Sequence, residues 1–180
     1  TPTVAPVAPL LKTKWGQGAP FNRKCPKYNG NPMLTGCTAT AMAQILNYYK
    51  SNSKGYDVLE YVNEGVGNKE ISVDFTKISY DWANMLDVYE DGSYTDAQAD
   101  AVAQLMYEAG VSCKAKYDVT WSGSGATSAA IPYVGFNRYY DYNCEIWVRE
   151  YVPTKLWMAV IQEELTAGRP ILYSGYNGAS

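Results

Sequence analysis

A cysteine begins the first of three segments that repeat apolar residues at helical spacing. Residues 37–50 carry apolar side chains at positions 39, 42, 43, 46 and 49. Side chains three or four residues apart share one face of a helix, so this pattern predicts a helix with one buried stripe. Cys37 would be its first residue and would lie at the positive end of the helix dipole.

A second helix is predicted over residues 96–109, and both of its ends have recognisable signals. Thr95 and Gln98 are spaced as a capping box, and Gly110 follows as a stop signal. The face expected to be buried comprises positions 101, 102, 105, 106 and 109.

A third helix is predicted after Pro153, with Thr154 as the expected N-cap and Gly168 at its end. Its apolar face comprises Leu156, Trp157, Val160, Ile161 and Leu165.

Short segments that favour strands occur mainly in the later part of the chain. Residues 70–75 are expected in a hairpin, and strands are predicted over residues 111–117 and 170–174. Two short helices are predicted near residues 80–86 and 128–136. Early helices followed by later strands favour an α+β fold.

The composition excludes several classes of function. The chain has 180 residues, a net charge of −3 and no Lys/Arg cluster, which argues against a nucleic-acid binder. It contains no apolar run long enough for a transmembrane segment. It contains no histidine, so these residues alone cannot provide a Ser–His or Cys–His pair or a histidine metal ligand. We expect neither a metal nor a cofactor.

Four cysteines, at positions 25, 37, 113 and 144, include no CxxC pair. Cys113 is expected in the core, and whether Cys25 and Cys144 are free or paired stays open. For Cys37 two interpretations compete: a small buried side chain that starts a core helix, or a nucleophile stabilised by the helix N-terminus. Gln17, in a glycine-rich loop upstream, could donate its amide to an oxyanion together with the backbone N–H of Cys37.

Several short motifs occur in order along the chain. The most specific is the Thr-Gly-Cys-Thr-Ala-Thr-Ala block at residues 35–41, with Gln17-Gly-Ala-Pro-Phe-Asn upstream. Weaker motifs continue through Ser122-Gly-Ser-Gly and Gly168-Arg-Pro-Ile-Leu-Tyr. Together they resemble the streptopain-like cysteine peptidases, which belong to the papain-like superfamily. Thr38 stands where the family often has valine, which does not touch the chemistry.

The resemblance implies a papain-like two-lobe fold and a secreted bacterial cysteine endopeptidase. It implies that Cys37 is the nucleophile and Gln17 the oxyanion donor, and that the glycine loop Gly123, Ser124 and Gly125 contacts the substrate backbone. Residues 1–110 would form a mainly helical lobe and residues 111–180 the start of a β-rich lobe of one domain. In this family a Gly-His motif follows shortly after the Arg-Pro strand, so we expect the fold to be incomplete at the C-terminus and the chain to be inactive alone.

The expected partners are protein or peptide substrates and the C-terminal remainder of the same polypeptide, which would carry the histidine. An inhibitory propeptide is a further candidate partner. Two rival hypotheses stay open: a non-catalytic module that binds protein or glycan through its many Tyr and Trp side chains, and a peptidase-like fragment with an inert or regulatory role. Fast alkylation of Cys37 would distinguish the enzyme from the binding module.

Overall fold

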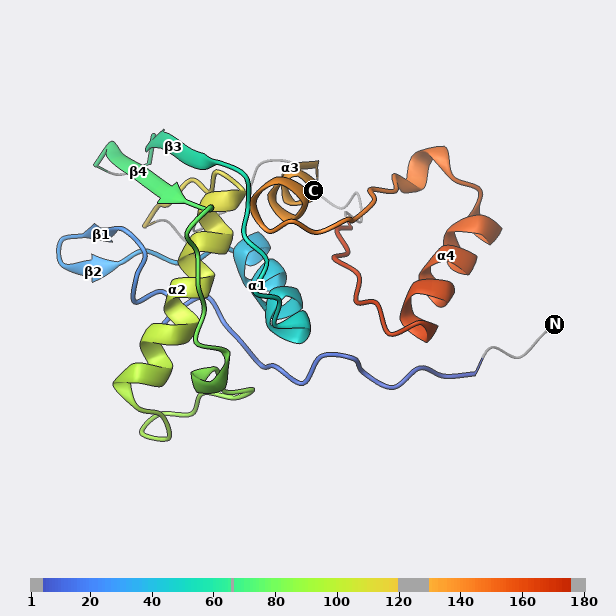
Figure 1. The fold of residues 1–180 in the computed structure, drawn as a ribbon, viewed down its shortest axis with the longest axis horizontal. Coiled ribbons are helices and arrows are strands. Elements are labelled where there is room, and N and C mark those ends of the chain that lie inside the picture. Colours follow the sequence, from blue (N-terminus) through green and yellow to red (C-terminus); the bar gives the residue numbers. More distant parts are fainter. Residues whose placement is uncertain (1–4, 66, 120–129, 176–180) are drawn as a thin grey trace.

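Two packed helices, α1 and α2, form the centre of the molecule (Figure 1). A computed structural model describes residues 5–65, 67–119 and 130–175. Helix α1 spans Cys37–Tyr49 and α2 spans Asp96–Ser112. The other elements, in chain order, are β1 (Lys27–Tyr28), β2 (Asn31–Pro32), β3 (Val58–Asn63), β4 (Lys69–Asp74), the 3-10 turn η1 (Trp82–Asn84), α3 (Ala130–Val134), the π-helical turn η2 (Gly135–Tyr139), the 3-10 turn η3 (Arg149–Tyr151) and α4 (Thr154–Thr166).

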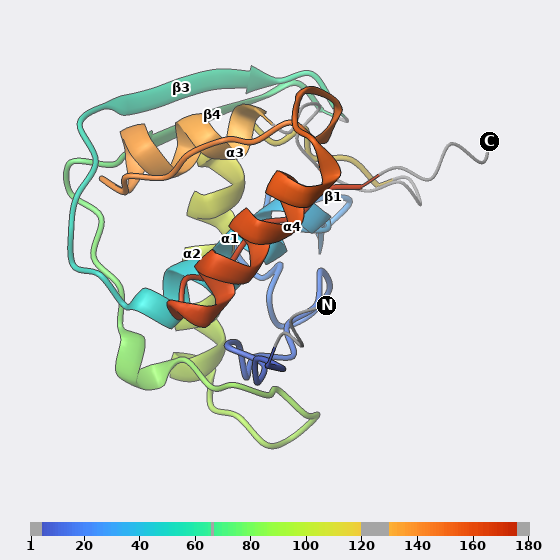
Figure 2. The same ribbon diagram turned by 90° about the vertical axis from the view of Figure 1, so that its right-hand side faces the viewer.

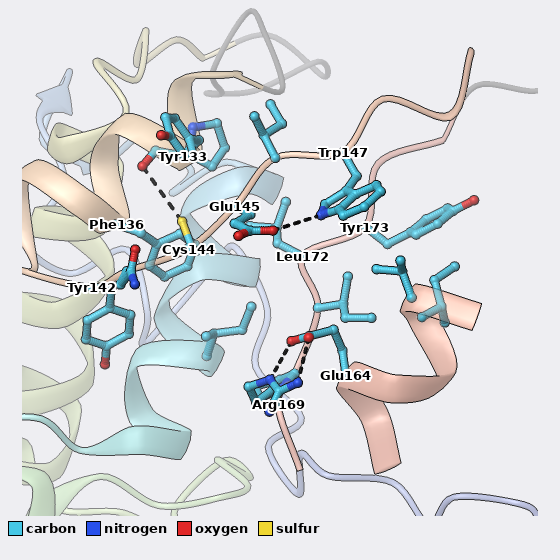
Figure 3. Close-up of a pocket in the computed structure, with 18 of the residues that line it drawn as sticks. Tyr133, Phe136, Tyr142, Cys144, Glu145, Trp147, Glu164, Arg169, Leu172 and Tyr173 are labelled. Carbon is cyan, nitrogen blue, oxygen red and sulfur yellow. Dashed lines mark hydrogen bonds and ion pairs between the residues drawn. The ribbon is translucent and has the colours of Figure 1, made fainter. Parts of the chain in front are cut away.

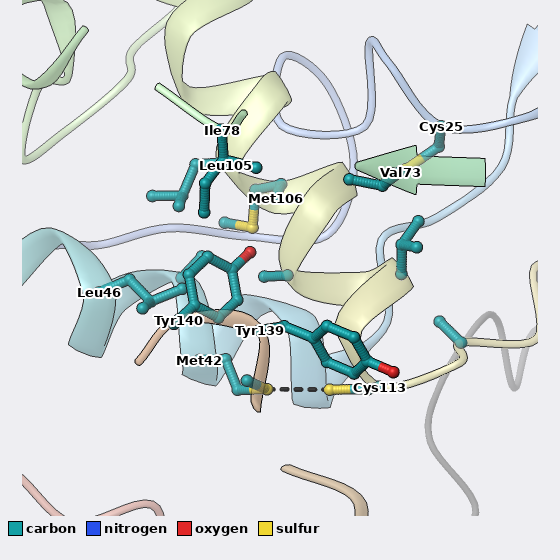
Figure 4. Close-up of a cluster of buried hydrophobic side chains, with 14 of the residues drawn as sticks. Cys25, Met42, Leu46, Val73, Ile78, Leu105, Met106, Cys113, Tyr139 and Tyr140 are labelled. Atoms are coloured by element: carbon teal, nitrogen blue, oxygen red, sulfur yellow. Dashed lines mark hydrogen bonds between the residues drawn. The ribbon is translucent and has the colours of Figure 1, made fainter. Parts of the chain in front are cut away.

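The apolar stripe of α1 packs into the core as the sequence predicts. Ala39, Met42, Ala43 and Leu46 are all buried, whereas Tyr49, at the end of the helix, is exposed. Figure 4 shows Met42 and Leu46 facing the side chains of α2. The helix ends at Lys50, whose left-handed backbone (φ 48°) lets its N–H donate to the Leu46 carbonyl.

Helix α2 confirms its predicted start and corrects its predicted end. The Thr95–Gln98 capping box is present in both directions. The helix continues through Gly110 to Ser112, so Gly110 is not the stop signal. Glycine is needed at position 110 for packing instead, because a Cβ there would lie 2.5 Å from the Tyr117 hydroxyl oxygen.

The predicted strand over residues 111–117 is not formed. Its first two residues belong to α2, and only Lys116 makes an isolated bridge. Burial does alternate along residues 113–117: Cys113, Ala115 and Tyr117 are buried, and the lysines between them are exposed. The backbone of Tyr117 pairs with a side chain rather than a strand: it accepts from Asn63 Nδ2 at 3.0 Å and donates to Asn63 Oδ1 at 2.8 Å.

The predicted hairpin is confirmed as β3 and β4, an antiparallel pair in which Leu59 faces Val73 and Tyr61 faces Ile71. Leu59, Ile71 and Val73 are buried and join the core around α2. The 3-10 turn η1 falls inside the predicted short helix at 80–86. Helix α3 and the turn η2 lie partly within the predicted helix near 128–136, whose first two residues are outside the described part of the chain.

Helix α4 forms where the sequence places a helix, but its surroundings differ from those expected. Pro153, not Thr154, is its N-cap, and none of its side chains is buried. Figure 1 shows it standing apart from the α1–α2 pair, and in the view of Figure 2 it lies in front of them. The predicted strand at 170–174 has no ladder partner among the described residues and stays extended without strand pairing. Both differences have one physical cause: an apolar helix face and a strand each need a second surface, and the described chain neither buries a side chain of α4 nor pairs residues 170–174 with another strand.

Glu108, a half-buried residue of α2, carries a carboxyl group that is not fully hydrogen-bonded. Glu108 Oε1 accepts from Gln104 Nε2 at 3.2 Å, while Oε2 has no hydrogen-bond partner in the part of the chain that the structure describes. Burial raises the pKa of this carboxyl, partly offset by the side chains of Tyr80 and Gln104. The protonated form is therefore favoured in the folded state.

Replacing Glu108 with Gln should remove a pH dependence from the stability of the fold. Because the folded-state pKa is raised, the contribution of Glu108 is fully present below its unfolded pKa of about 4.3 and is lost as pH rises through the folded value. The unfolding free energy of the wild type should therefore fall relative to that of Glu108→Gln as the pH rises above about 4, in urea titrations at each pH.

Glu164 provides a matched control. The hydrogen-bonded Arg169 lowers the pKa of Glu164. The difference in unfolding free energy between the wild type and Glu164→Gln should therefore change with pH in the opposite direction. If the wild type lost stability with rising pH relative to both variants, the raised pKa of Glu108 would be contradicted.

Candidate active site

Cys37 is the first residue of α1, and its side chain is exposed. The residue before it, Gly36, has φ 88° and ψ 151°, a backbone conformation that is open to glycine and costly for other residues. No side chain caps the start of the helix. The thiol thus lies at an uncapped helix N-terminus, where the dipole and free N–H groups favour a negative charge.

The loop that carries Gln17 is tied to the residues just before Cys37. The Thr35 N–H donates to the Gln17 carbonyl at 3.2 Å, which brings the loop alongside the start of α1. The loop is also anchored on its other side, because the buried Trp15 donates its indole N–H to the Leu86 carbonyl at 2.9 Å. The structure therefore brings the Gln17 loop and the start of α1 into one region, and the catalytic roles of Gln17 and Cys37 stay predictions.

The other three cysteines have different surroundings, and all four are free. Cys25 and Cys113 are buried, and burial raises the pKa of each thiol to about 12. Cys113 lies in the core as predicted, at the end of α2 rather than in a strand, with its Sγ 2.9 Å from Met42 Sδ. Cys144 is half-buried, and burial raises its pKa as well. Cys37 is the one exposed thiol.

The predicted substrate loop, Gly123, Ser124 and Gly125, lies outside the described residues. The chain leading to it is fixed at Tyr117 by the two hydrogen bonds from Asn63. Close packing there also explains Gly65, where a Cβ would lie 2.0 Å from the Tyr117 carbonyl oxygen.

A separate pocket of about 860 Å³ lies between α4 and the end of α1, and sequence reasoning did not identify it. Figure 3 shows aromatic side chains on its walls, among them Phe136, Trp147 and Tyr173. Arg169 and Glu164 form a two-bond ion pair at 2.7 Å on one side. Neither Cys37 nor Gln17 lines this pocket. The exposed apolar stripe of α4 was the signal that could have pointed to it.

Several acidic side chains in the described part of the chain have polar partners of their own. Asp141 accepts from the Tyr56 hydroxyl, Glu145 from the Trp147 indole, and Glu164 pairs with Arg169. Within residues 5–65, 67–119 and 130–175, no group of His, Cys, Asp and Glu side chains could hold a metal ion. The described helices include none with the length and apolar character needed to cross a membrane.

An exposed cysteine that starts a long core helix, beside a loop with a candidate oxyanion donor, is the arrangement of a cysteine peptidase of the papain-like class. Comparison of the chain with known protein families and structures agrees with this class. The sequence pattern of the Peptidase C10 family matches residues 15–180, and the chain belongs to that family.

Named relatives and a solved structure support the assignment. The chain is 29% identical to streptopain of Streptococcus pyogenes and 28% identical to the thiol protease/hemagglutinin PrtT of Porphyromonas gingivalis, over 94% and 96% of its length. It spans 46% of streptopain and 21% of PrtT. The active interpain A cysteine protease of Prevotella intermedia matches with a TM-score of 0.82 and 38% identity, over 91% of this chain and 67% of that one. The fold is therefore α+β and papain-like, corresponding to part of the interpain A structure.

Cys37 should be the fastest of the four thiols to react with iodoacetamide. At about pH 8 we expect its rate to exceed those of Cys25 and Cys113 at least about tenfold, because those two thiols are buried and burial raises their pKa. Mass spectrometry of the digested protein after timed quenching gives each rate. After unfolding in guanidinium all four should react alike, and equal rates in the folded protein would contradict the site.

Proposed function

We propose that the protein is a secreted or cell-surface bacterial cysteine endopeptidase, in which this chain supplies the nucleophile and the oxyanion donors. The observation that carries the proposal is the exposed thiol of Cys37 at the first position of α1, next to the loop of Gln17. Membership of a cysteine peptidase family makes protein or peptide substrates the natural class.

The proposed reaction begins with attack of the Cys37 thiolate on the carbonyl carbon of a peptide bond. The carbonyl oxygen then becomes an oxyanion, which would accept hydrogen bonds from the Cys37 N–H and the Gln17 side-chain amide. An acid must protonate the leaving amine, and a water molecule then hydrolyses the thioester and frees the thiol. The glycine loop at residues 123–125 is proposed to hold the substrate backbone.

The proton-transfer group has to come from outside these residues. The chain contains no histidine, and it spans two thirds of the interpain A chain that it matches. We propose that a C-terminal remainder of the same polypeptide brings the histidine and covers the apolar side of α4. The unburied face of α4, the pocket beside it and the unpaired residues 171–174 are consistent with such an occupant.

Removing the thiol should abolish peptide hydrolysis. In the longest natural form of the polypeptide, we expect Cys37→Ala to have no measurable turnover of a fluorogenic peptide, because no other group can form the thioester. Gln17→Ala should lower kcat about 100-fold through loss of one oxyanion donor. Gln162→Ala, which changes an exposed glutamine outside the proposed site, is the matched control and should retain activity. Hydrolysis by Cys37→Ala would overturn the proposal and favour a binding module.

Residues 1–180 alone should be inactive, because the unassisted thiol lacks the base that deprotonates it and the acid that protonates the leaving group. Adding the C-terminal remainder should restore hydrolysis and should protect the apolar face of α4 from hydrogen exchange. The assay compares the isolated chain before and after the addition. Full activity of the histidine-free chain would refute the Cys–His mechanism, and protection without activity would favour the inert-fragment hypothesis.

A further inference from the structure

Two buried threonine hydroxyls surround the carbonyl group that precedes Cys37. Thr40 Oγ1 donates to the Gly36 carbonyl oxygen at 2.9 Å, and the Thr40 N–H donates to the same oxygen at 3.1 Å. Thr35 Oγ1 lies 3.0 Å from Thr40 Oγ1. Thr35 is 0% and Thr40 8% exposed, so water does not compete for these bonds.

The direction of the hydroxyl pair follows from the proton count. A threonine hydroxyl has one proton to donate and two lone pairs that accept. With the Thr40 proton donated to the Gly36 oxygen, the Thr40 oxygen is left to accept from Thr35, whose hydroxyl also lies 3.5 Å from the same carbonyl oxygen. The bonds therefore run from Thr35 to Thr40 to the Gly36 carbonyl.

This arrangement fixes the orientation of the Cys37 N–H. The Gly36 carbonyl and the Cys37 N–H belong to one planar peptide group and point to opposite sides of it. Two donors on the carbonyl oxygen hold the plane, so the N–H is directed away from the helix. Bonds to the carbonyl oxygen also polarise the peptide group and strengthen its N–H as a donor.

The same threonines connect to the loop of the second proposed oxyanion donor. The Thr35 N–H holds the Gln17 carbonyl at 3.2 Å. The Thr40 carbonyl accepts from Gln44 Nε2 at 3.2 Å, and Gln44 Oε1 accepts from Thr13 Oγ1 at 2.7 Å. One network of hydrogen bonds thus joins the start of α1 to both sides of the Gln17 loop.

We propose that Thr40, supported by Thr35, is a positioning residue that aims and polarises the Cys37 N–H as an oxyanion donor. The inference rests on the proposed function. The alternative is a purely structural role, because a helical threonine often donates to the carbonyl four residues earlier. A structural role predicts lost stability, whereas the positioning role predicts lost transition-state binding at unchanged thiol reactivity.

The test compares Thr40→Val, which keeps the shape and removes the hydroxyl, with Thr40→Ser, which keeps the hydroxyl. In the longest natural form of the polypeptide, we expect Thr40→Val to lower kcat about tenfold with little change in KM, less than the loss of a whole donor. Thr40→Ser should stay within about threefold of the wild type. Thr38→Val, the same substitution two residues earlier, is the matched control and should leave kcat unchanged.

Alkylation of Cys37 separates positioning from general damage. Iodoacetamide reacts at a saturated carbon and forms no oxyanion, so its rate should be the same in Thr40→Val and the wild type. Expressing kcat per alkylatable Cys37 thiol removes any loss of folded protein from the comparison. Thr35→Val, which leaves both Thr40 bonds to the Gly36 carbonyl in place, should lower kcat by a smaller factor and serves if Thr40→Val does not fold.

The possible results separate the inference from the proposed function. Unchanged kcat in both Thr40→Val and Thr35→Val, or an equal fall in alkylation and turnover, would overturn the positioning role. If Cys37→Ala also retained activity, the proposed function itself would fail. Loss of turnover in Cys37→Ala with normal kcat in Thr40→Val would overturn the inference alone.

Discussion

The packing of α1 against α2 is the contact on which the rest of the structure depends. Met42 of α1 and Val102 and Met106 of α2 are 0% exposed, so the interface excludes water completely at its centre. Burying side chains of this size contributes roughly 1.5 to 3 kcal/mol each to the free energy of unfolding. Because α1 is held along its length, the residue at its first position has a defined place.

The candidate site is built largely from backbone groups held by that helix pair. Gly36 adopts a conformation that other residues avoid, and the buried hydroxyls of Thr35 and Thr40 fix its carbonyl. The Gln17 loop is attached to the same residues through the Thr35 N–H. A reactive group on a fixed helix end, with its neighbours held by buried hydrogen bonds, loses little order when a substrate binds.

The region around α4 has a different physical character. Its helix is formed by local periodicity, yet no side chain of it is buried, and the extended residues 171–174 have no strand partner in the described part of the chain. Secondary structure there is set locally, while the tertiary contacts that would bury it are absent from these residues. The contrast with α1 explains why one part of the chain defines a site and the other exposes an apolar pocket.

The sequence by itself determined the elements whose causes are local. Apolar spacing predicted α1 and α2, the Thr95–Gln98 box set the start of α2, and the motif around Cys37 predicted a cysteine at the start of a helix. Only the tertiary structure decided which segments find partners. Residues 111–117 alternate in burial like a strand, yet the side chain of Asn63 satisfies the backbone at Tyr117, and α2 extends through Gly110 because Tyr117 packs there. The hydrogen bonds from Thr35 and Thr40 likewise depend on how the Gln17 loop meets the helix, and contacts between distant segments leave no periodic signal in the sequence.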